Sequence, residues 1–376
     1  MANTLTALAP QLFSAALTVS SEPAGVLDSI NLDFDSKGVA IGDSVKVPVA
    51  PSASVSSFTP AMTTPSGTDA TAASVAVTIT ANNQVSWNLT GEQMQSLANA
   101  ESDKEWARQM IAQGMRALRN QAELDAAAAI KTGASRAYGT AGTTPFASDL
   151  TALTNVYKIL KDNGAPMADL NLCINTNAAL NLRNLGIIQQ AYQAGNDQER
   201  RSGNFLRQFG FAIKESAGIV SHTAGTGSAY VTSGATAPKV TDIALVTGSG
   251  TVLAGDIVTF AADTVNKYVV NNGVAAPGTI SLGRPGARAT IATANAMTIG
   301  GAYTPNLAFE RSAVVGVFRA PLLPPNANMK LLNISDANGM TYTLAEIAGD
   351  GMVTWRLHAA WGFKVVNPEH VAILIG

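Results

Sequence analysis

The sequence predicts an α+β protein that is built around one long helix and interrupted by a small all-β module. Three observations support this prediction. Residues 101–133 contain 10 of the 50 charged residues of the chain and no proline. Mixed helical and strand-like patterns lie on both sides of residues 221–300, a stretch that carries 11 of the 33 glycines. Within that stretch, short Val-, Thr- and Ile-rich runs are separated by Gly, Asn and Pro, which is typical of a small barrel or sandwich.

The composition limits the classes of function. The 376 residues are enough for two or three domains. Only 13% of them are charged, against about 25% in typical soluble proteins. Low charge suits a protein that buries much of its surface against copies of itself, and it also suits secreted β-rich proteins. The net charge of −2 and the lack of a Lys/Arg-rich run argue against tight nucleic-acid binding.

Cysteine content and the apolar pattern bear on the compartment. A single cysteine, Cys173, rules out an intrachain disulfide framework and a multi-cysteine metal site. In LNLCIN it is expected to be a small core residue. No Lys or Arg precedes Lys37 and Pro10 interrupts the apolar start, so we expect no signal peptide. No apolar run approaches the roughly 18 residues of a membrane span. These features predict a soluble protein made in a cytoplasm.

The first hundred residues predict an arm and a hairpin. In residues 1–50, a helical piece (TALAPQLFSAAL) precedes short strands in SINLDFDSKGVAIGDSVKVPVAP. Residues 51–100 contain no Lys or Arg. Within them, ASVAVTITANNQVSWNL alternates around Asn82-Asn83, which predicts a long two-stranded hairpin. A hairpin that stands out from a domain is marginal in water, so another surface is expected to cover it.

Residues 101–133 predict the long helix. Ser102 and Glu105 form a capping box, in which the hydroxyl and the carboxylate each satisfy a backbone N–H at the helix start. Gly133 is the predicted stop, since glycine tolerates the left-handed conformation that closes a helix. About 30 residues give a rod of roughly 45 Å, whereas helices in globular domains average about 11–12 residues.

The two faces of this helix differ. One face carries an apolar stripe, formed by Ile111, Met115, Leu118, Ala122 and Ala129. Trp106, Met110 and Leu124 lie beside this stripe. Another part of the helix surface carries a charged band, formed by Glu105, Arg108, Arg116, Arg119 and Glu123. Two pairs of opposite charge in this band are three or four residues apart, which lets their side chains meet. The pairs are Glu105–Arg108 and Arg119–Glu123. The band is either a solvated face or a surface that pairs with a neighbouring subunit, and the helix alone does not decide between them.

The remaining segments complete the α+β pattern. DLTALTNVYKILKDNGAP predicts a helix that ends at Asn-Gly, and ADLNLCINTNAALNLRNL predicts a buried strand followed by a second helix. After the β-rich stretch the mixed pattern returns with NLAFERSAVVGVFRAPLLPP and continues to the C-terminus. The simplest organisation is one α+β domain interrupted by an inserted β-module.

No motif requires an active site. The three histidines, His222, His358 and His370, have no HxH or HxxxH spacing, and no GxSxG elbow accompanies them. His358 is expected to be a partly buried side chain of a strand. Gly225 and Gly227 in TAGTGSAY imitate part of a phosphate loop, but they lack the following Lys-Ser/Thr, so we expect a turn at a domain junction.

Several polar groups have structural interpretations. Asp149, Asp162 and Asp169 are expected at helix starts or turns, where carboxylates cap backbone N–H groups. GDGM at 349–352 has too few oxygen ligands for a Ca²⁺ loop. Arg200 and Arg201 lie in an exposed polar loop or in a subunit contact. We therefore assign no catalytic, cofactor-binding or metal-binding residue.

The order of these parts resembles a known family. The stretches that carry the resemblance are GNFLRQFGFAIKESAGIVSHTAGTG, then NLAFERSAVVGVFRAPL, then GMVTWRLHAAWGFKVVNPEHVAILIG. With the arm, the hairpin and the long helix before them, they resemble phage major capsid proteins of the Hong Kong 97 fold, and most of all the coat proteins of short-tailed phages that carry an inserted β-barrel domain. The likeness covers the whole chain in layout, whereas the matching residues are soft motifs.

The resemblance implies a fold, a function and partners. It implies a virion component that is made in the host cytoplasm, assembles as pentamers and hexamers into an icosahedral shell around double-stranded DNA, and is not an enzyme. It implies that the partners are further copies of the chain, a separate scaffolding protein and a portal protein, with non-specific DNA contacts and no membrane or cofactor. The implied parts are an N-terminal arm (1–50), an extended hairpin (51–98), a peripheral domain with the spine helix (99–147), the first part of an axial domain (148–223), an inserted β-barrel-like domain (224–300), and the axial and peripheral return with the C-terminal strands (301–376).

Three further expectations depend on this resemblance. The arm and the hairpin should be mobile in the free subunit. The shell should lack covalent cross-links, because the namesake phage uses a hairpin lysine and none lies between Lys46 and Lys104. The scaffold should be a separate protein, because residues 1–50 contain no long heptad run. Two alternatives stay open, an encapsulating shell protein of the same fold and a secreted β-rich surface or adhesin protein.

Overall fold

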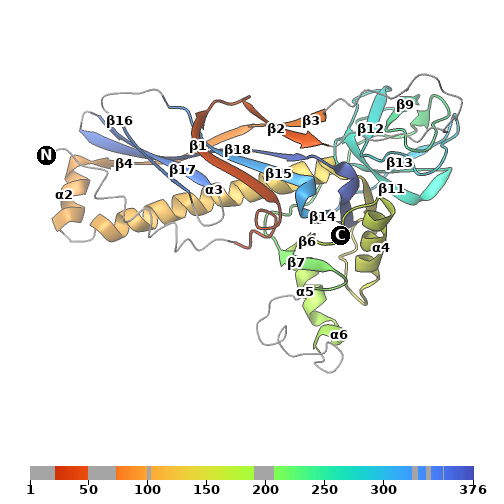
Figure 1. Cartoon of the computed structure of the whole chain (residues 1–376), viewed down its shortest axis with the longest axis horizontal. Helices are drawn as coiled ribbons and strands as arrows, with labels where there is room; N and C mark the ends of the chain where they lie inside the picture. The colour runs from red at the N-terminus through yellow and green to blue at the C-terminus, as the bar shows by residue number, and fades with distance from the viewer. Residues whose placement is uncertain are drawn as a thin grey trace, which may run out of the picture.

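The chain folds into an elongated molecule, which a computed structural model describes for residues 22–49, 73–99, 103–189, 207–323, 329–335, 340–349 and 351–376. One extended part contains a long helix and a twisted sheet (Figure 1). A second part, built from helices and short strands, lies below one end of that helix, and a group of short strands lies beyond the same end (Figure 1). The predicted α+β class is confirmed, since long helices and large sheets are both present.

A six-stranded sheet forms the body of the extended part. Its strands are β1 (Asn31–Val39), β4 (Ala81–Thr90), β15 (Val314–Pro321), β16 (Met329–Ser335), β17 (Thr341–Ala348) and β18 (Met352–Val365). The order is β1-β15-β18-β17-β16, and β4 pairs with β18 along ten residues. Only the β1–β15 pair is parallel. The sheet therefore joins the N-terminal strand to strands from the last third of the chain.

The long predicted helix is present as α3 (Asp103–Gly133) and follows a short helix, α2 (Gly91–Asn99). Its predicted apolar stripe faces β18, with Ile111, Met115 and Leu118 each at most 3% exposed. Ala129 is only half-buried, and Ala126 and Ile130 take its place in the core. Ser102 of the predicted capping box lies outside the described residues. The helix ends at Gly133 as expected.

The reason for the stop at Gly133 differs from the prediction. Gly133 has no positive φ. A Cβ at this position would lie 2.5 Å from the Val365 side chain. The helix end lies so close to β18 that only glycine fits. Gly133 is therefore needed for this close contact and not for a left-handed helix cap.

A second, larger sheet joins the compact part to the strand group. Its order is β7-β6-β14-β19-β5-β11-β12-β9-β8, with β10 paired to β11 and β13. The strands of the compact part are β5 (Arg136–Tyr138), β6 (Leu170–Ile174), β7 (Phe211–Glu215), β14 (Pro305–Glu310) and β19 (Val371–Ile375). The helices beside them are α4 (Thr151–Asp162), α5 (Thr176–Asn184) and α6 (Gly186–Gln189).

Local signals explain the elements of the compact part. Helix α4 ends where Asn-Gly was predicted, at Asn163 and at Gly164 with φ of 78°. Every residue of β6 is buried, as the run LNLCI predicted. Asn175 then caps α5 by accepting a hydrogen bond from the Ala178 N–H at 2.9 Å.

Residues 226–300 contain six short strands and no helix. They are β8 (Val231–Thr232), β9 (Asp242–Val246), β10 (Ile257–Phe260), β11 (Asp263–Asn272), β12 (Thr279–Leu282) and β13 (Met297–Ile299). These strands enclose their own core, which contains Tyr230, Phe260 and Tyr268. Strand β11 also pairs with β5, so the strand group continues the large sheet instead of hanging from a flexible linker.

The predicted hairpin around Asn82-Asn83 is wrong in its pairing, although both strands are present. Strand β3 (Ala73–Thr78) pairs with β2 (Ser44–Val49), and β4 pairs with β18. Asn82 and Asn83 lie within β4 opposite Ala360 and Ala359. Between β3 and β4, the Ile79 N–H donates to the Asp43 carbonyl at 2.9 Å. An alternating pattern of apolar and polar residues predicts a strand but does not specify its partner strand. Pairing with β18 gives β4 a longer ladder of backbone hydrogen bonds than pairing with β3 would.

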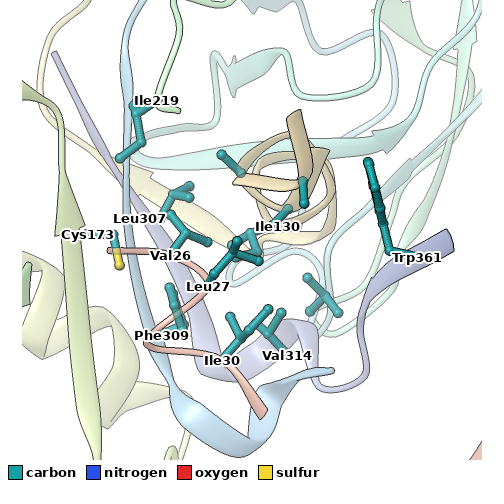
Figure 2. Close-up of a cluster of buried hydrophobic side chains, with 14 of the residues drawn as sticks. Val26, Leu27, Ile30, Ile130, Cys173, Ile219, Leu307, Phe309, Val314 and Trp361 are labelled. Carbon is teal, nitrogen blue, oxygen red and sulfur yellow. The ribbon is translucent and has the colours of Figure 1, made fainter. Parts of the chain in front are cut away.

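The main core lies where the N-terminal segment, α3 and both sheets meet. Residues 22–30, which we call the strap, cross this junction before β1 begins. Figure 2 shows Val26, Leu27 and Ile30 of the strap beside Ile130 of α3 and near Phe309 and Val314. The three strap side chains are at most 2% exposed. Burial of such side chains contributes about 1.5–3 kcal/mol each. The strap is therefore a buried part of the core, while residues 1–21 of the predicted arm lie outside the described part.

Candidate assembly surfaces

The histidines do not gather into a site. His358 is buried in β18, opposite Gln84 and Thr343, and burial together with Arg356 lowers its pKa. His370 lies in the short 3-10 turn before β19, and His222 lies at the start of the strand group. Within the described ranges, no three His, Cys, Asp or Glu side chains are grouped as a metal site would require. No described helix combines the length and apolar character of a membrane span.

The glycines of TAGTGSAY have a structural role at a junction. The Gly225 N–H donates to both carboxylate oxygens of Asp256, at 3.1 Å each. No helix follows Gly227; the next element is the two-residue strand β8. The helix N-terminus that a phosphate loop needs is thus missing from this part of the chain, and residues 223–227 form an irregular loop at the junction instead of the predicted turn.

The three aspartates that we expected at helix starts or turns make different contacts. Asp149 accepts a hydrogen bond from the Thr151 N–H at 2.8 Å at the start of α4, as expected. Asp162 is the last residue of α4 and pairs with Lys158 at 3.7 Å, so it caps no helix start. Asp169 pairs with Arg207 at 3.6 Å across the surface. Asp350 of GDGM and the pair Arg200 and Arg201 lie outside the described residues.

The charged band of α3 divides into two halves. At its start, the Arg108 Nη2 lies 2.7 Å from the Glu105 Oε1, which confirms the predicted pair. The guanidinium and Gln109 lower the pKa of Glu105 to about 2. Both side chains are well exposed, so this pair contributes little to stability.

The C-terminal half of the band contacts the strap of the same chain. Arg116 and Asn120 both donate to the Glu22 carboxylate and lower its pKa to about 2. The Arg119 Nη2 lies 3.3 Å from the Asp28 Oδ1. Neither the solvated nor the neighbour-facing interpretation of the whole band is correct, because these cations hold the N-terminal segment of their own subunit.

Glu123 is the centre of this attachment, and its predicted pairing with Arg119 is wrong. Its carboxylate is 2% exposed and accepts hydrogen bonds from the Val26 N–H at 2.8 Å and the Leu27 N–H at 2.9 Å. The Ser216 hydroxyl, from the end of β7, also donates to it at 2.6 Å. Burial raises the pKa of Glu123, although these three donors partly offset the effect. One carboxylate thereby joins the strap, the long helix and the compact part.

Sequence reasoning missed the strap entirely. The available signal was the run EPAGVLDSI, in which two acidic residues flank the apolar Val26 and Leu27, and Ile30 follows. Its charge complements Arg116 and Arg119, which lie almost a hundred residues away. Nothing in the local pattern specifies that long-range pairing.

The outward face of α3 carries little charge. Between the terminal pair and the helix end, the exposed side chains on this face are Gln109, Gln113, Ala117, Gln121 and Ala128. A face of glutamine and alanine can approach another protein surface without leaving an unpaired charge buried. The exposed positions of this face are therefore uncharged, and Asp125 beside Gln121 is only partly exposed.

The β2–β3 pair is the second candidate surface. Val45, Val47 and Val75 are half-buried against a small core that contains Ile79 and Val317. Lys46, Pro48 and Ser44 alternate with the valines and are exposed. The paired strands thus begin at residue 44 and include Lys46, whereas the predicted extended hairpin begins at residue 51. The outer edges of both strands have no partner strand among the described elements.

A polar cleft of about 510 Å³ lies between the strap and β7. Arg183 and Glu215 form an ion pair at 2.6 Å in its wall, and Lys214 donates to the Asp28 carbonyl at 2.7 Å. The cleft contains no histidine or cysteine among its lining residues. Its charged groups bind one another, which is typical of an interface between elements rather than of a reaction site.

Comparison with known proteins gives structural similarities only. No family model matches the chain, and no curated protein matches it. The chain is similar to the capsid structure of cyanophage P-SCSP1u, with 14% identity over 95% of this chain and 89% of that chain and a TM-score of 0.49. It is similar to the mature capsid of bacteriophage PhiM1, with 12% identity, 93% and 86% coverage and a TM-score of 0.47. It is also similar to a virus-like particle from Pyrococcus furiosus, with 9% identity, 97% and 96% coverage and a TM-score of 0.43. The solved structures that the chain resembles thus include phage capsids.

Proposed function

We propose that this chain is a phage major capsid protein of the Hong Kong 97 type, which assembles as pentamers and hexamers into an icosahedral shell around double-stranded DNA. The observation that carries the proposal is the extended part of the fold. A 31-residue helix, a six-stranded sheet and a separate hairpin form a long, thin body instead of a compact one (Figure 1). A thin body buries less surface than a compact domain of equal size. Packing of such bodies side by side recovers that burial.

The parts of the molecule suit this role. In this proposal α3 is the spine helix of a peripheral domain, with the six-stranded sheet beneath it. The compact part with α4 and α5 is the axial domain, and residues 224–300 are the inserted β-module. The extended hairpin is formed by β2 (44–49) and β3 (73–78), in place of the predicted 51–98. The neutral outer face of α3 and the edges of β2 and β3 are the surfaces that contact neighbouring copies.

The proposed partners follow from charge and surface. Contacts between copies are the main interaction, and obligate interfaces of this kind bury about 2,000–5,000 Å². The net charge of −2 suits a container that holds DNA without binding it tightly. A separate scaffolding protein and a portal protein are the further proposed partners, and the chain itself performs no chemical reaction.

Electron microscopy of the purified chain tests the proposal. The chain is expressed alone and together with the neighbouring genes of its source. We expect rings, curved sheets or closed shells, with uniform closed shells only in the co-expressed sample. A stable monomer at every concentration and salt condition would contradict the proposal. Uniform empty shells from the chain alone would favour the encapsulating-protein alternative and remove the need for a scaffold.

We predict that such shells are not chemically cross-linked. Lys46 lies in β2, so the hairpin does contain a lysine, and the original reason for this expectation no longer holds. Lys46 is exposed, however, and a solvated ammonium is a poor nucleophile because activation needs desolvation or a base. Heating assembled particles in SDS should therefore release monomers only. A ladder of covalent oligomers that disappears in Lys46→Arg would show that this lysine reacts.

A further inference from the structure

The outer edge of β4 is a long strand edge without the usual protection. β4 pairs with β18 along ten residues in an unbroken register. No strand among the described elements pairs with its other side. Because unpaired edges attract strands of other chains, proteins protect them with charged residues, prolines, bulges or short lengths. The sequence of β4, ANNQVSWNLT, contains no charged residue and no proline.

The other long outer strands of the described sheets differ from β4. Lys330 lies in β16, and Lys214 lies in β7. Lys46 lies in β2, and Asp33 lies in β1. β3 has no charged residue either, but it is only six residues long. β4 is thus the longest uncharged edge in the part of the chain that the structure describes. An edge of this kind either promotes aggregation or is covered by another strand.

The backbone of β4 directs every second residue toward this outer edge. The Gly91 N–H, directly after β4, donates to the Gly351 carbonyl at 3.3 Å, and the β4–β18 register continues to this pair. Hydrogen-bonded pairs alternate along an antiparallel ladder, so the odd-numbered residues of β4 bond to β18 and the even-numbered residues have outward N–H and C=O groups. The Thr90 N–H agrees with this alternation, because it donates to the Gln93 side chain at 3.1 Å.

The side chains of β4 suit pairing of this edge with a second copy of itself. Those of the even-numbered residues are exposed, polar and uncharged, and they are Asn82, Gln84, Ser86, Asn88 and Thr90. A two-fold axis brings residues close to their own copies, so a charged side chain there would face a like charge. On the other face of the strand, Val85 and Trp87 pack against α3 beside Gly114. Valine opposite tryptophan is a favourable cross-strand pair.

We propose that two copies of this chain pair through β4, antiparallel about a two-fold axis at Ser86, so that their six-stranded sheets join. In this register Ser86 faces its own copy, and Gln84 faces Asn88 of the second copy. The outward N–H and C=O groups of these three residues then make about six backbone hydrogen bonds between the chains. The same register sets Val85 of each chain opposite Trp87 of the other. Because both copies contribute the same surface, no further complementary surface is needed.

The size of this contact determines how the pair should behave. One strand from each copy forms a smaller contact than a stable interface, which buries at least about 1,200 Å². We therefore expect pairing in the free chain to be weak and reversible, and a test has to trap the pair. The proposal concerns the unassembled chain, so it does not depend on whether the chain forms a shell.

Cross-linking of cysteine variants of the full chain tests this inference. The native Cys173 is fully buried, so a thiol introduced on β4 is the accessible one. Hydrogen-bonded residues across an antiparallel ladder lie about 5.5 Å apart, which a short bismaleimide spans. Ser86→Cys should therefore give a covalent dimer. Gln84→Cys alone should give little, because its two copies lie four residues apart along the strand, or about 14 Å. A mixture of Gln84→Cys and Asn88→Cys chains should give the covalent heterodimer.

A proline on the edge separates strand pairing from random collision. Added to the Ser86→Cys chain, Gln84→Pro removes an outward N–H that β18 does not use. Loss of this donor from both copies should lower the dimer yield by about ten-fold, whereas the matched Gln84→Ala chain should cross-link like its parent.

Three results would overturn the proposal. They are a Ser86→Cys chain that stays monomeric, equal dimer yields from the single variants at 84, 86 and 88, and equal yields from the proline and alanine chains when both unfold at the same urea concentration. If the proline chain folds poorly, the three cysteine positions still decide, because these variants keep the backbone of β4 intact. None of these results tests shell assembly, so failure of this inference and failure of the proposed function are distinguishable.

Discussion

Replacement of Glu123 by alanine should lower the free energy of unfolding by about 3 kcal/mol and release the strap from α3. The change removes the shared acceptor of the Val26 N–H, the Leu27 N–H and the Ser216 hydroxyl. A buried donor without a partner costs about 1–3 kcal/mol, and water entry satisfies some of the three. A cleft of about 170 Å³ already lies beside Glu123, so water has a route to these donors.

The measurement is urea unfolding together with hydrogen exchange of residues 22–30. Glu105→Ala is the matched control, because Glu105 lies in the same helix and makes an exposed pair with Arg108. Exposed pairs are worth about 0–1 kcal/mol, so this control should unfold nearly like the wild type. Equal destabilisation by both variants, or unchanged protection of the strap in Glu123→Ala, would show that the buried carboxylate is not the anchor.

The pH dependence of the same site has a defined sign. Because burial raises the pKa of Glu123 in the folded state, folding favours its protonated form. Its contribution is complete below the unfolded pKa of about 4.3 and declines as the pH rises through the folded pKa. The side chain in the neutral analogue Glu123→Gln does not titrate, so this variant lacks the pH-dependent contribution to stability. The stability of the wild type relative to Glu123→Gln should therefore fall as the pH rises above about 4.3, and a rise would contradict the buried position of the carboxylate.

The strap also shows what the sequence predicts and what it does not. Local signals located α3, α4, β6 and the strands of residues 226–300, because helix periodicity, turn residues and apolar runs act over a few residues. The same signals located β3 and β4 but assigned them to each other, since alternation specifies a face and not a partner strand. The charged band was visible, yet its partners Glu22 and Asp28 lie about ninety residues away. Long-range complementarity of this kind depends on the fold, which places β1 beside β15 and so brings the strap to α3.

Replacement of Gly362 by alanine should detach the root of the β2–β3 hairpin from the six-stranded sheet. A Cβ at Gly362 would lie 2.1 Å from the Thr78 carbonyl oxygen and 3.0 Å from the Ile79 Cα. Both are backbone atoms, so the conflict cannot be relieved by a side-chain rotation. The Thr80 N–H, which donates to the Trp361 carbonyl at 3.1 Å, must move with them.

The expected result is a loss of about 1–3 kcal/mol, the usual cost of overpacking, with faster hydrogen exchange at residues 44–49 and 73–80. Val77 and Ile79 are at most 1% exposed in the small core beneath the hairpin, and displacement of the root uncovers them. Gly91→Ala is the control, because a Cβ there meets no atom within 4 Å at the start of α2. If the hairpin carries subunit contacts as proposed, Gly362→Ala should also give malformed or no shells under conditions in which Gly91→Ala assembles normally. Normal shells from a Gly362→Ala chain with a demonstrably loosened hairpin would place the subunit contacts elsewhere, on the neutral face of α3.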